Sequence, residues 1–132
     1  MTPENEPPIL DTDHLDMMTG ADADLAAEVV GIFQHQAEVW GRMLSAGEPP
    51  ETWADAAHTI KGAALGVGAK RLAEACAQAE TLGRSGEVSR AQAALVLADV
   101  REQLNLALEA AARRTHELAG SAGFSASKAS NS

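Results

Sequence analysis

Glycines and prolines divide this chain of 132 residues into segments of helical length, with breaks at Gly20 and at residues 47–50, 66–68 and 83–86. Between the breaks, apolar residues recur every three or four positions, which is the spacing of one face of an α-helix. Aromatic residues make up only 3% of the chain and Tyr is absent, whereas strands favour aromatic and β-branched side chains. The pattern predicts an all-α fold.

The segments predict five helices. The first is short, at about residues 13–18, and ends at Gly20; the second is capped by Asp22 or Asp24 and runs to the break at 47–50. Three more are expected at about residues 51–65, 69–81 and 88–117. The predicted buried stripe of the second helix consists of Leu25, Val29, Ile32, Phe33, Trp40, Met43 and Leu44. The stripes of the later helices consist of Trp53, Ala57, Ile60, Ala64 and Val67, then Leu72, Cys76, Ala79 and Leu82, then Ala93, Leu97, Val100, Leu104, Leu108 and Ala111.

Four long amphipathic helices with short connections predict an antiparallel four-helix bundle, with the short first helix covering one end. We expect one domain at residues 9–117, a flexible lead at 1–8 that carries three prolines, and a disordered Ala/Ser/Gly-rich tail at 118–132. Bundles of this kind host many functions, so the fold alone does not indicate the function.

The net charge of −9 argues against partners rich in phosphate, such as nucleic acid and anionic membranes. The single cysteine, Cys76, excludes an intrachain disulfide and suits a reducing compartment. The sequence shows neither a secretory signal pattern nor an apolar run of membrane-spanning length. We therefore expect a soluble cytoplasmic protein, and a single compact bundle suggests a monomer.

The segment around His58 carries the strongest chemical pattern. With about 100° of turn per residue, His58 points away from the stripe of Ala57, Ile60 and Ala64 and toward solvent. Lys61 and Gly62 follow three and four positions later, so both neighbour His58 along the helix surface. Glycine in a helix costs about 1 kcal/mol relative to alanine, and one reason to accept that cost is clearance for an approaching protein.

Charge is distributed unevenly along the chain. Residues 1–55 hold twelve acidic side chains and one basic side chain, whereas residues 56–73 hold Lys61, Lys70 and Arg71 and no acid. This arrangement predicts a neutral-to-basic patch around one exposed histidine, which would suit a partner with an acidic pocket.

The run from His58 to Ala63, followed by Gly68, Ala69 and Leu72, resembles the motif of histidine-phosphotransfer (HPt) domains of bacterial two-component phosphorelays. That motif is His, two residues, Lys-Gly, a small residue and then a Leu-Gly-Ala turn. The resemblance covers about residues 10–112, including Leu10-Asp11 and Glu80, and Val67 stands where the turn usually has Leu.

The resemblance implies that His58 accepts a phosphoryl group, usually on Nε2, from a receiver-domain aspartate or a kinase and passes it to a response regulator. Lys61 would be the charge partner of the phosphoryl group, and Gly62 would provide clearance for the partner. The implied partners are receiver domains of response regulators or a hybrid sensor histidine kinase. The protein would be a carrier with no cofactor and no ATP site of its own, and the receiver would supply the Mg²⁺.

Several alternatives stay open from the residues themselves. Each of the three residues also has a structural interpretation. His58 could be an ordinary exposed histidine, Lys61 an ordinary surface lysine, and Gly62 a site of close helix–helix approach. Two other functions are open for the whole protein. The first is a helical adaptor that binds signalling partners without phosphotransfer. The second is a metal-binding bundle, which is disfavoured because the apolar stripes lack the inward carboxylates of known di-metal bundles. Residues expected to have no functional role are His14, His35, His116, Cys76, Trp40 and Trp53.

Overall fold

The computed structural model describes residues 7–130 of the chain, and within that range it contains helices and no strand. The helices are α1 (Thr12–Thr19), α2 (Ala23–Gly41), α3 (Pro50–Gly66), α4 (Lys70–Gly83) and α5 (Arg90–Ser130). The predicted all-α class and the five predicted helices are confirmed.

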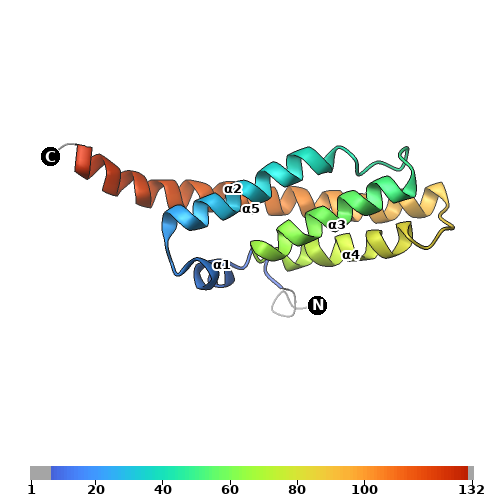
Figure 1. Ribbon diagram of the computed structural model, residues 1–132, viewed down its shortest axis with the longest axis horizontal. Helices are drawn as coiled ribbons and strands as arrows, with labels where there is room; N and C mark the ends of the chain where they lie inside the picture. Colours follow the sequence, from blue (N-terminus) through green and yellow to red (C-terminus); the bar gives the residue numbers. More distant parts are fainter. Residues whose placement is uncertain (1–6, 131–132) are drawn as a thin grey trace.

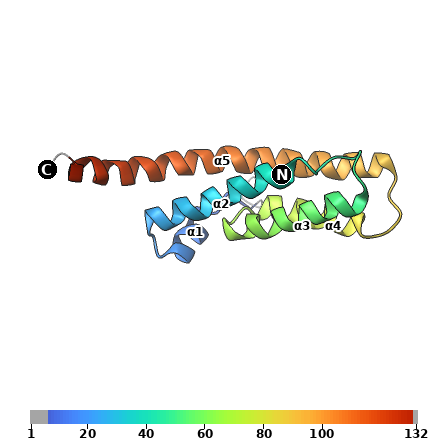
Figure 2. The ribbon, with the colours of Figure 1, turned by 45° about the horizontal axis from the view of Figure 1, so that its top comes forward.

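The four long helices form a bundle in which each packs against two others. Helix α3 contacts α2 and α4, and α5 contacts the other sides of α2 and α4 (Figures 1 and 2). Figure 2 shows α5 along one side of the bundle and the α3–α4 pair along the other, with α1 at the end where α2 begins. Helices α3 and α4 run in opposite directions, are joined by the short turn between Gly66 and Lys70, and lie side by side (Figure 1).

Local chemistry sets the helix ends close to their predicted places. Asp22 caps α2, because its side chain accepts a hydrogen bond from the Leu25 N–H at 3.0 Å. Gly20 ends α1 in the left-handed region, with φ of 63°. Gly68 turns the chain between α3 and α4 with φ of 75°, and its carbonyl accepts a hydrogen bond from the Asp11 N–H. The segment before α1 is thereby tied to the α3–α4 turn.

The predicted stripes of the last three helices lie in the core, but the predicted stripe of α2 is partly wrong. Leu25, Ile32 and Met43 are exposed, and the side of α2 that faces the bundle consists of Ala26, Val30, Phe33 and Ala37. The prediction followed the large apolar residues. Two alanines in the contact face allow α2 to approach its neighbours closely, so the helix is rotated and some large side chains are left on its flank.

Helix α5 extends further than the sequence indicated. The predicted end was near Glu117, and the helix is assigned through Ser130. Apart from that helix, the predicted disorder of residues 118–132 is not tested. Residues 131 and 132 lie outside the described residues, and so do residues 1–6 of the predicted flexible lead. In the part of the chain that the structure describes, no helix combines the length and the apolar character needed to cross a bilayer.

Candidate functional site

His58 stands on the outward face of α3. Its side chain is 61% exposed, whereas Ala57 and Ile60 beside it are fully buried. The outward direction predicted from helical periodicity is therefore confirmed. Apolar contacts on the opposite face fix the rotation of α3, and that rotation presents the imidazole to an incoming molecule.

Glu80 of α4 holds one side of the imidazole. Its Oε2 atom lies 2.9 Å from His58 Nδ1. An ionised carboxylate can only accept hydrogen bonds, so Nδ1 must carry the proton in this contact. In neutral imidazole the other nitrogen, Nε2, then carries the lone pair. The contact selects the tautomer in which Nε2 is the nucleophilic atom.

Lys61 lies one helical turn from His58 and also contacts Glu80. Its Nζ donates to Glu80 Oε1 at 2.8 Å, so the two oxygens of one carboxylate serve the two side chains. The hydrogen bond from Lys61 is the main reason that the pKa of Glu80 is lowered, with a smaller contribution from Arg84 and from the charge interactions with Lys61 and His58. The lowered pKa favours the ionised form of Glu80, which accepts the proton of His58 Nδ1.

Arg84 and Asp55 complete the cluster. Arg84 Nε lies 3.3 Å from Glu80 Oε2, and its Nη2 lies 2.9 Å from Asp55 Oδ1. Hydrogen bonds to Asp55 first and Glu80 second raise the pKa of the guanidinium. Two cations and two carboxylates therefore surround His58, and their charges cancel.

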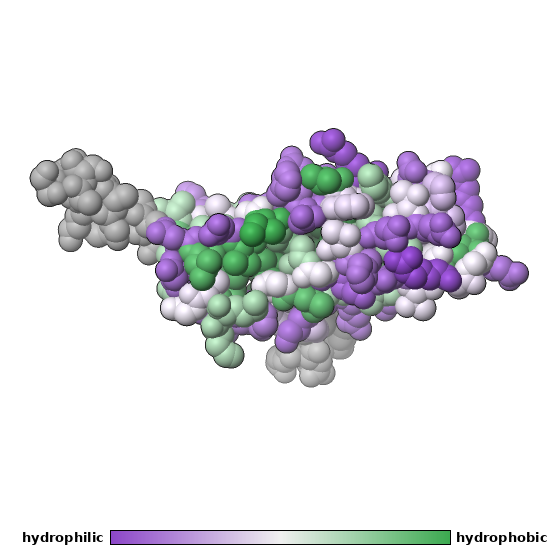
Figure 3. All heavy atoms as spheres, in the orientation of Figure 1, coloured by the Kyte–Doolittle hydropathy of each residue, from purple (hydrophilic) through white to green (hydrophobic). Residues whose placement is uncertain are grey.

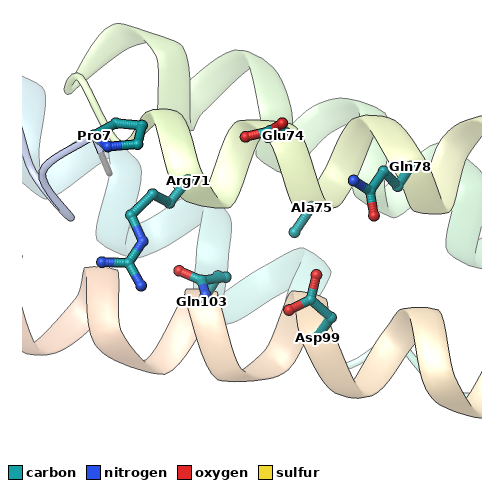
Figure 4. Close-up of a pocket in the computed structure, with 7 residues that line it drawn as sticks. All are labelled: Pro7, Arg71, Glu74, Ala75, Gln78, Asp99 and Gln103. Atoms are coloured by element: carbon teal, nitrogen blue, oxygen red, sulfur yellow. The ribbon is translucent and has the colours of Figure 1, made fainter. Parts of the chain in front are cut away.

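The charged residues that surround His58 in the structure are not the same as those predicted from the sequence. Of the three predicted basic residues, only Lys61 contacts the His58 cluster. Arg71 lies on another side of α4, in a pocket of about 320 Å³ between α4 and α5 that also holds Glu74 and Asp99 (Figure 4). The predicted neutral-to-basic character is compatible with these charges, which cancel, but Arg84 and Asp55 join the cluster from other parts of the sequence because α3 packs on α4.

Gly62 opens onto empty space. A Cβ atom built on it would meet no neighbouring atom within 4 Å, so the alternative of a close helix–helix approach does not apply to this glycine. The exposed apolar side chains of Leu25, Ile32 and Leu65 come from α2 and the end of α3. Figure 3 shows apolar surface over this part of the molecule, beside a strongly polar area over the first half of α3 and the adjoining end of α4.

Three of the residues expected to have no functional role contribute to the core. Cys76 and Trp53 are fully buried, and Trp40 is partly buried against the core. Burial raises the pKa of the Cys76 thiol to about 12, so it behaves as a small core residue. Within the described residues no three His, Cys, Asp or Glu side chains are grouped so as to hold a metal ion.

The sequence pattern did not show the role of Arg84, and it indicated Glu80 only as part of the family resemblance. One signal was available, because Glu80 and Arg84 are four positions apart and so form an ion pair along one helix face. Nothing in the sequence connects that pair to His58, which lies 22 positions before Glu80. Only the packing of α3 on α4 makes the connection.

Comparison with known proteins gives consistent results. A family model described as the Hpt domain matches residues 23–111. The crystal structure of the histidine phosphotransferase ShpA from Caulobacter crescentus is 36% identical in sequence and superposes with a TM-score of 0.70 over 87% of this chain and 98% of that one. A putative histidine-containing phosphotransfer protein from rice shares the fold at 18% identity, with a TM-score of 0.59 over 83% of this chain and 84% of its own. No curated protein matched the chain significantly.

Proposed function

The chain belongs to the Hpt domain family, whose function is histidine phosphotransfer in phosphorelays, and from that premise we propose that His58 is its phosphoryl acceptor. The observation that carries the proposal is one contact of the imidazole ring together with the ring's exposure. Nδ1 is bound to Glu80 at 2.9 Å, and the ring is 61% exposed, which leaves Nε2 available. His58 is also the histidine of the Lys-Gly motif.

The transfer follows from these contacts. The Nε2 lone pair attacks the phosphorus of an aspartyl phosphate on a receiver domain, a bond forms between Nε2 and phosphorus, and the bond from phosphorus to the aspartate oxygen breaks. The aspartate leaves as a carboxylate. The ring becomes positively charged while Nδ1 keeps its proton, and the Glu80 carboxylate stabilises that charge. The reverse sequence delivers the group to a second receiver.

Lys61 serves in this proposal as the charge partner of the phosphoryl group. The Lys61 side chain is 29% exposed and its ammonium uses one donor on Glu80, so further donors remain for phosphoryl oxygens. Phosphoryl transfer depends mainly on positioning and charge neutralisation, and a compact cation one helical turn away provides both.

The partner is a receiver domain that docks over Gly62. The space beside Gly62 admits the backbone of an approaching protein, and the exposed Leu65, three positions later on the same helix, offers apolar contact area nearby. Within this proposal the protein is a monomeric cytoplasmic carrier without an ATP site, and the Mg²⁺ that transfer requires is bound by the receiver.

The proposal is tested by incubating the protein with a receiver domain carrying ³²P-labelled aspartyl phosphate. We expect label on the protein that is stable in base and labile in acid, as a phosphohistidine is. We expect no label on a His58→Gln variant and ordinary labelling of His35→Gln, which removes another exposed histidine. Unchanged labelling of His58→Gln would overturn the assignment, and binding of receivers without any labelling would favour an adaptor.

A further inference from the structure

The end of α4 lies unusually close to the beginning of α3. A Cβ atom built on Gly83 would lie 2.8 Å from Ala54 Cβ, 2.8 Å from an atom of the Trp53 ring and 2.9 Å from the Pro50 carbonyl oxygen. Only a residue without a side chain permits this separation. Because the two helix ends touch here, the next residue, Arg84, lies beside the α3 surface that carries Asp55 and His58.

Arg84 joins the two helices through two carboxylates. Its Nη2 donates to Asp55 on α3, and its Nε donates to Glu80 on α4. A guanidinium group is planar and holds its donors at fixed angles, so binding at one nitrogen orients the other. Asp55 therefore anchors the guanidinium, and the guanidinium in turn restricts Glu80.

His58 and Arg84 share one oxygen atom. Glu80 Oε2 accepts from His58 Nδ1 at 2.9 Å and from Arg84 Nε at 3.3 Å, while Oε1 accepts from Lys61. The terminal torsion of a glutamate has a broad energy profile. With Lys61 alone, the carboxylate would be held at one oxygen and could turn Oε2 away from the imidazole. The second contact, from Arg84, limits that rotation.

We propose that Arg84, anchored by Asp55, is a positioning residue for phosphotransfer that holds Glu80 Oε2 against His58 and so maintains the tautomer with a free Nε2. The inference rests on the proposed phosphoryl acceptor His58 for its kinetic consequence. Its structural consequence, the ratio of the two imidazole tautomers, exists in the protein alone. The two readouts therefore separate a failure of this inference from a failure of the proposed function.

The first measurement is the ¹⁵N NMR spectrum of the His58 imidazole at alkaline pH, where the ring is neutral. In the wild-type protein we expect the proton mainly on Nδ1. In Arg84→Gln we expect the population with the proton on Nε2 to rise severalfold. Arg113→Gln removes one positive charge from an exposed position on α5 and serves as the matched control, with the wild-type ratio.

The second measurement is the rate of transfer from a phosphorylated receiver at increasing receiver concentration. For Arg84→Gln we expect the maximal rate to fall about fivefold and the half-saturating concentration to stay constant. Arg84→Lys should recover little of the rate, since an ammonium lacks the fork that reaches both carboxylates. Arg84 is 45% exposed, so we expect the variants to keep the thermal midpoint of the wild-type protein.

A double-mutant cycle tests the anchor. If Asp55 acts through Arg84, Asp55→Asn should lower the maximal rate by a smaller factor, and adding Asp55→Asn to Arg84→Gln should lower it no further. Independent, multiplying effects would overturn the anchoring role. A wild-type tautomer ratio in Arg84→Gln would refute the positioning role. A change confined to the half-saturating concentration would refute it as well and would make Arg84 a docking residue.

Discussion

Two glycines on the neighbouring helices α3 and α4 are present for opposite reasons. At Gly83 the place of a side chain is already filled, because Ala54, Trp53 and the Pro50 carbonyl lie within 3.0 Å of where a Cβ atom would be. At Gly62 that place is empty to beyond 4 Å. The first glycine belongs to the packed contact between the helices, and the second belongs to the surface beside His58.

The difference shows how one helix pair serves stability and chemistry at once. Close packing at Gly83 sets the distance between α3 and α4, which brings Glu80 and Arg84 to His58. The open surface at Gly62 then lets a partner reach the imidazole. The same amino acid thus has a structural role in one place and, in the proposed function, an access role in the other.

The largest expected effect is that of Gly83→Leu. The added side chain has to displace backbone and a buried tryptophan, so we expect the free energy of unfolding to fall by about 3 kcal/mol or more. Urea denaturation followed by circular dichroism measures this. A loss below about 1 kcal/mol would mean that the ends of α3 and α4 can separate with little loss of free energy.

The same substitution at Gly62 should have the opposite profile. In Gly62→Leu we expect the free energy of unfolding to rise by about 0.5–1 kcal/mol, because leucine is the better helix former, while receiver-dependent labelling falls roughly tenfold or more from steric exclusion.

The matched control for this variant is Gly31→Leu, at an exposed and equally open position on α2. It should gain similar stability and keep normal labelling. Normal labelling of Gly62→Leu would remove the access role of Gly62.

Lys61→Ala sharpens the surface side of the comparison. We expect the transfer rate to fall about fivefold or more, because the phosphoryl group loses its nearby cation, with a change in stability within about 1 kcal/mol, since the ion pair is partly exposed. Labelling time courses and urea denaturation give the two values. A rate equal to that of the wild-type protein would make Lys61 an ordinary surface lysine.

The smallest expected effect concerns Glu80 and pH. Its pKa is lowered in the folded protein, so the carboxylate contributes stability above its unfolded pKa, and that contribution is lost as the pH falls through the folded pKa. Between neutral and acidic pH, we expect the free energy of unfolding to fall less in Glu80→Gln than in the wild-type protein, with a difference of about 1 kcal/mol at most. Denaturation curves at several pH values test this, and parallel pH profiles for the two proteins would contradict it.

Much of the fold followed from local pattern. Periodic apolar residues and capping side chains placed the helices, and residues such as Trp53, Ile60, Leu72 and Leu97 are buried as predicted. The stripe of α2 was less well predicted, because Leu25 and Ile32 are larger than Ala26 and Ala37 and so dominated the pattern. Which side of a helix faces its neighbours depends on how closely the backbones approach, and small residues decide that distance.

The sequence by itself determined the all-helical class, the outward position of His58 and its neighbours Lys61 and Gly62, because these depend on spacing along one helix. Only the tertiary structure decided that Glu80, Arg84 and Asp55 meet at the imidazole and that Gly83 allows them to. Contacts between residues 22 or 29 positions apart depend on the rotation and separation of two helices, which the whole core fixes together.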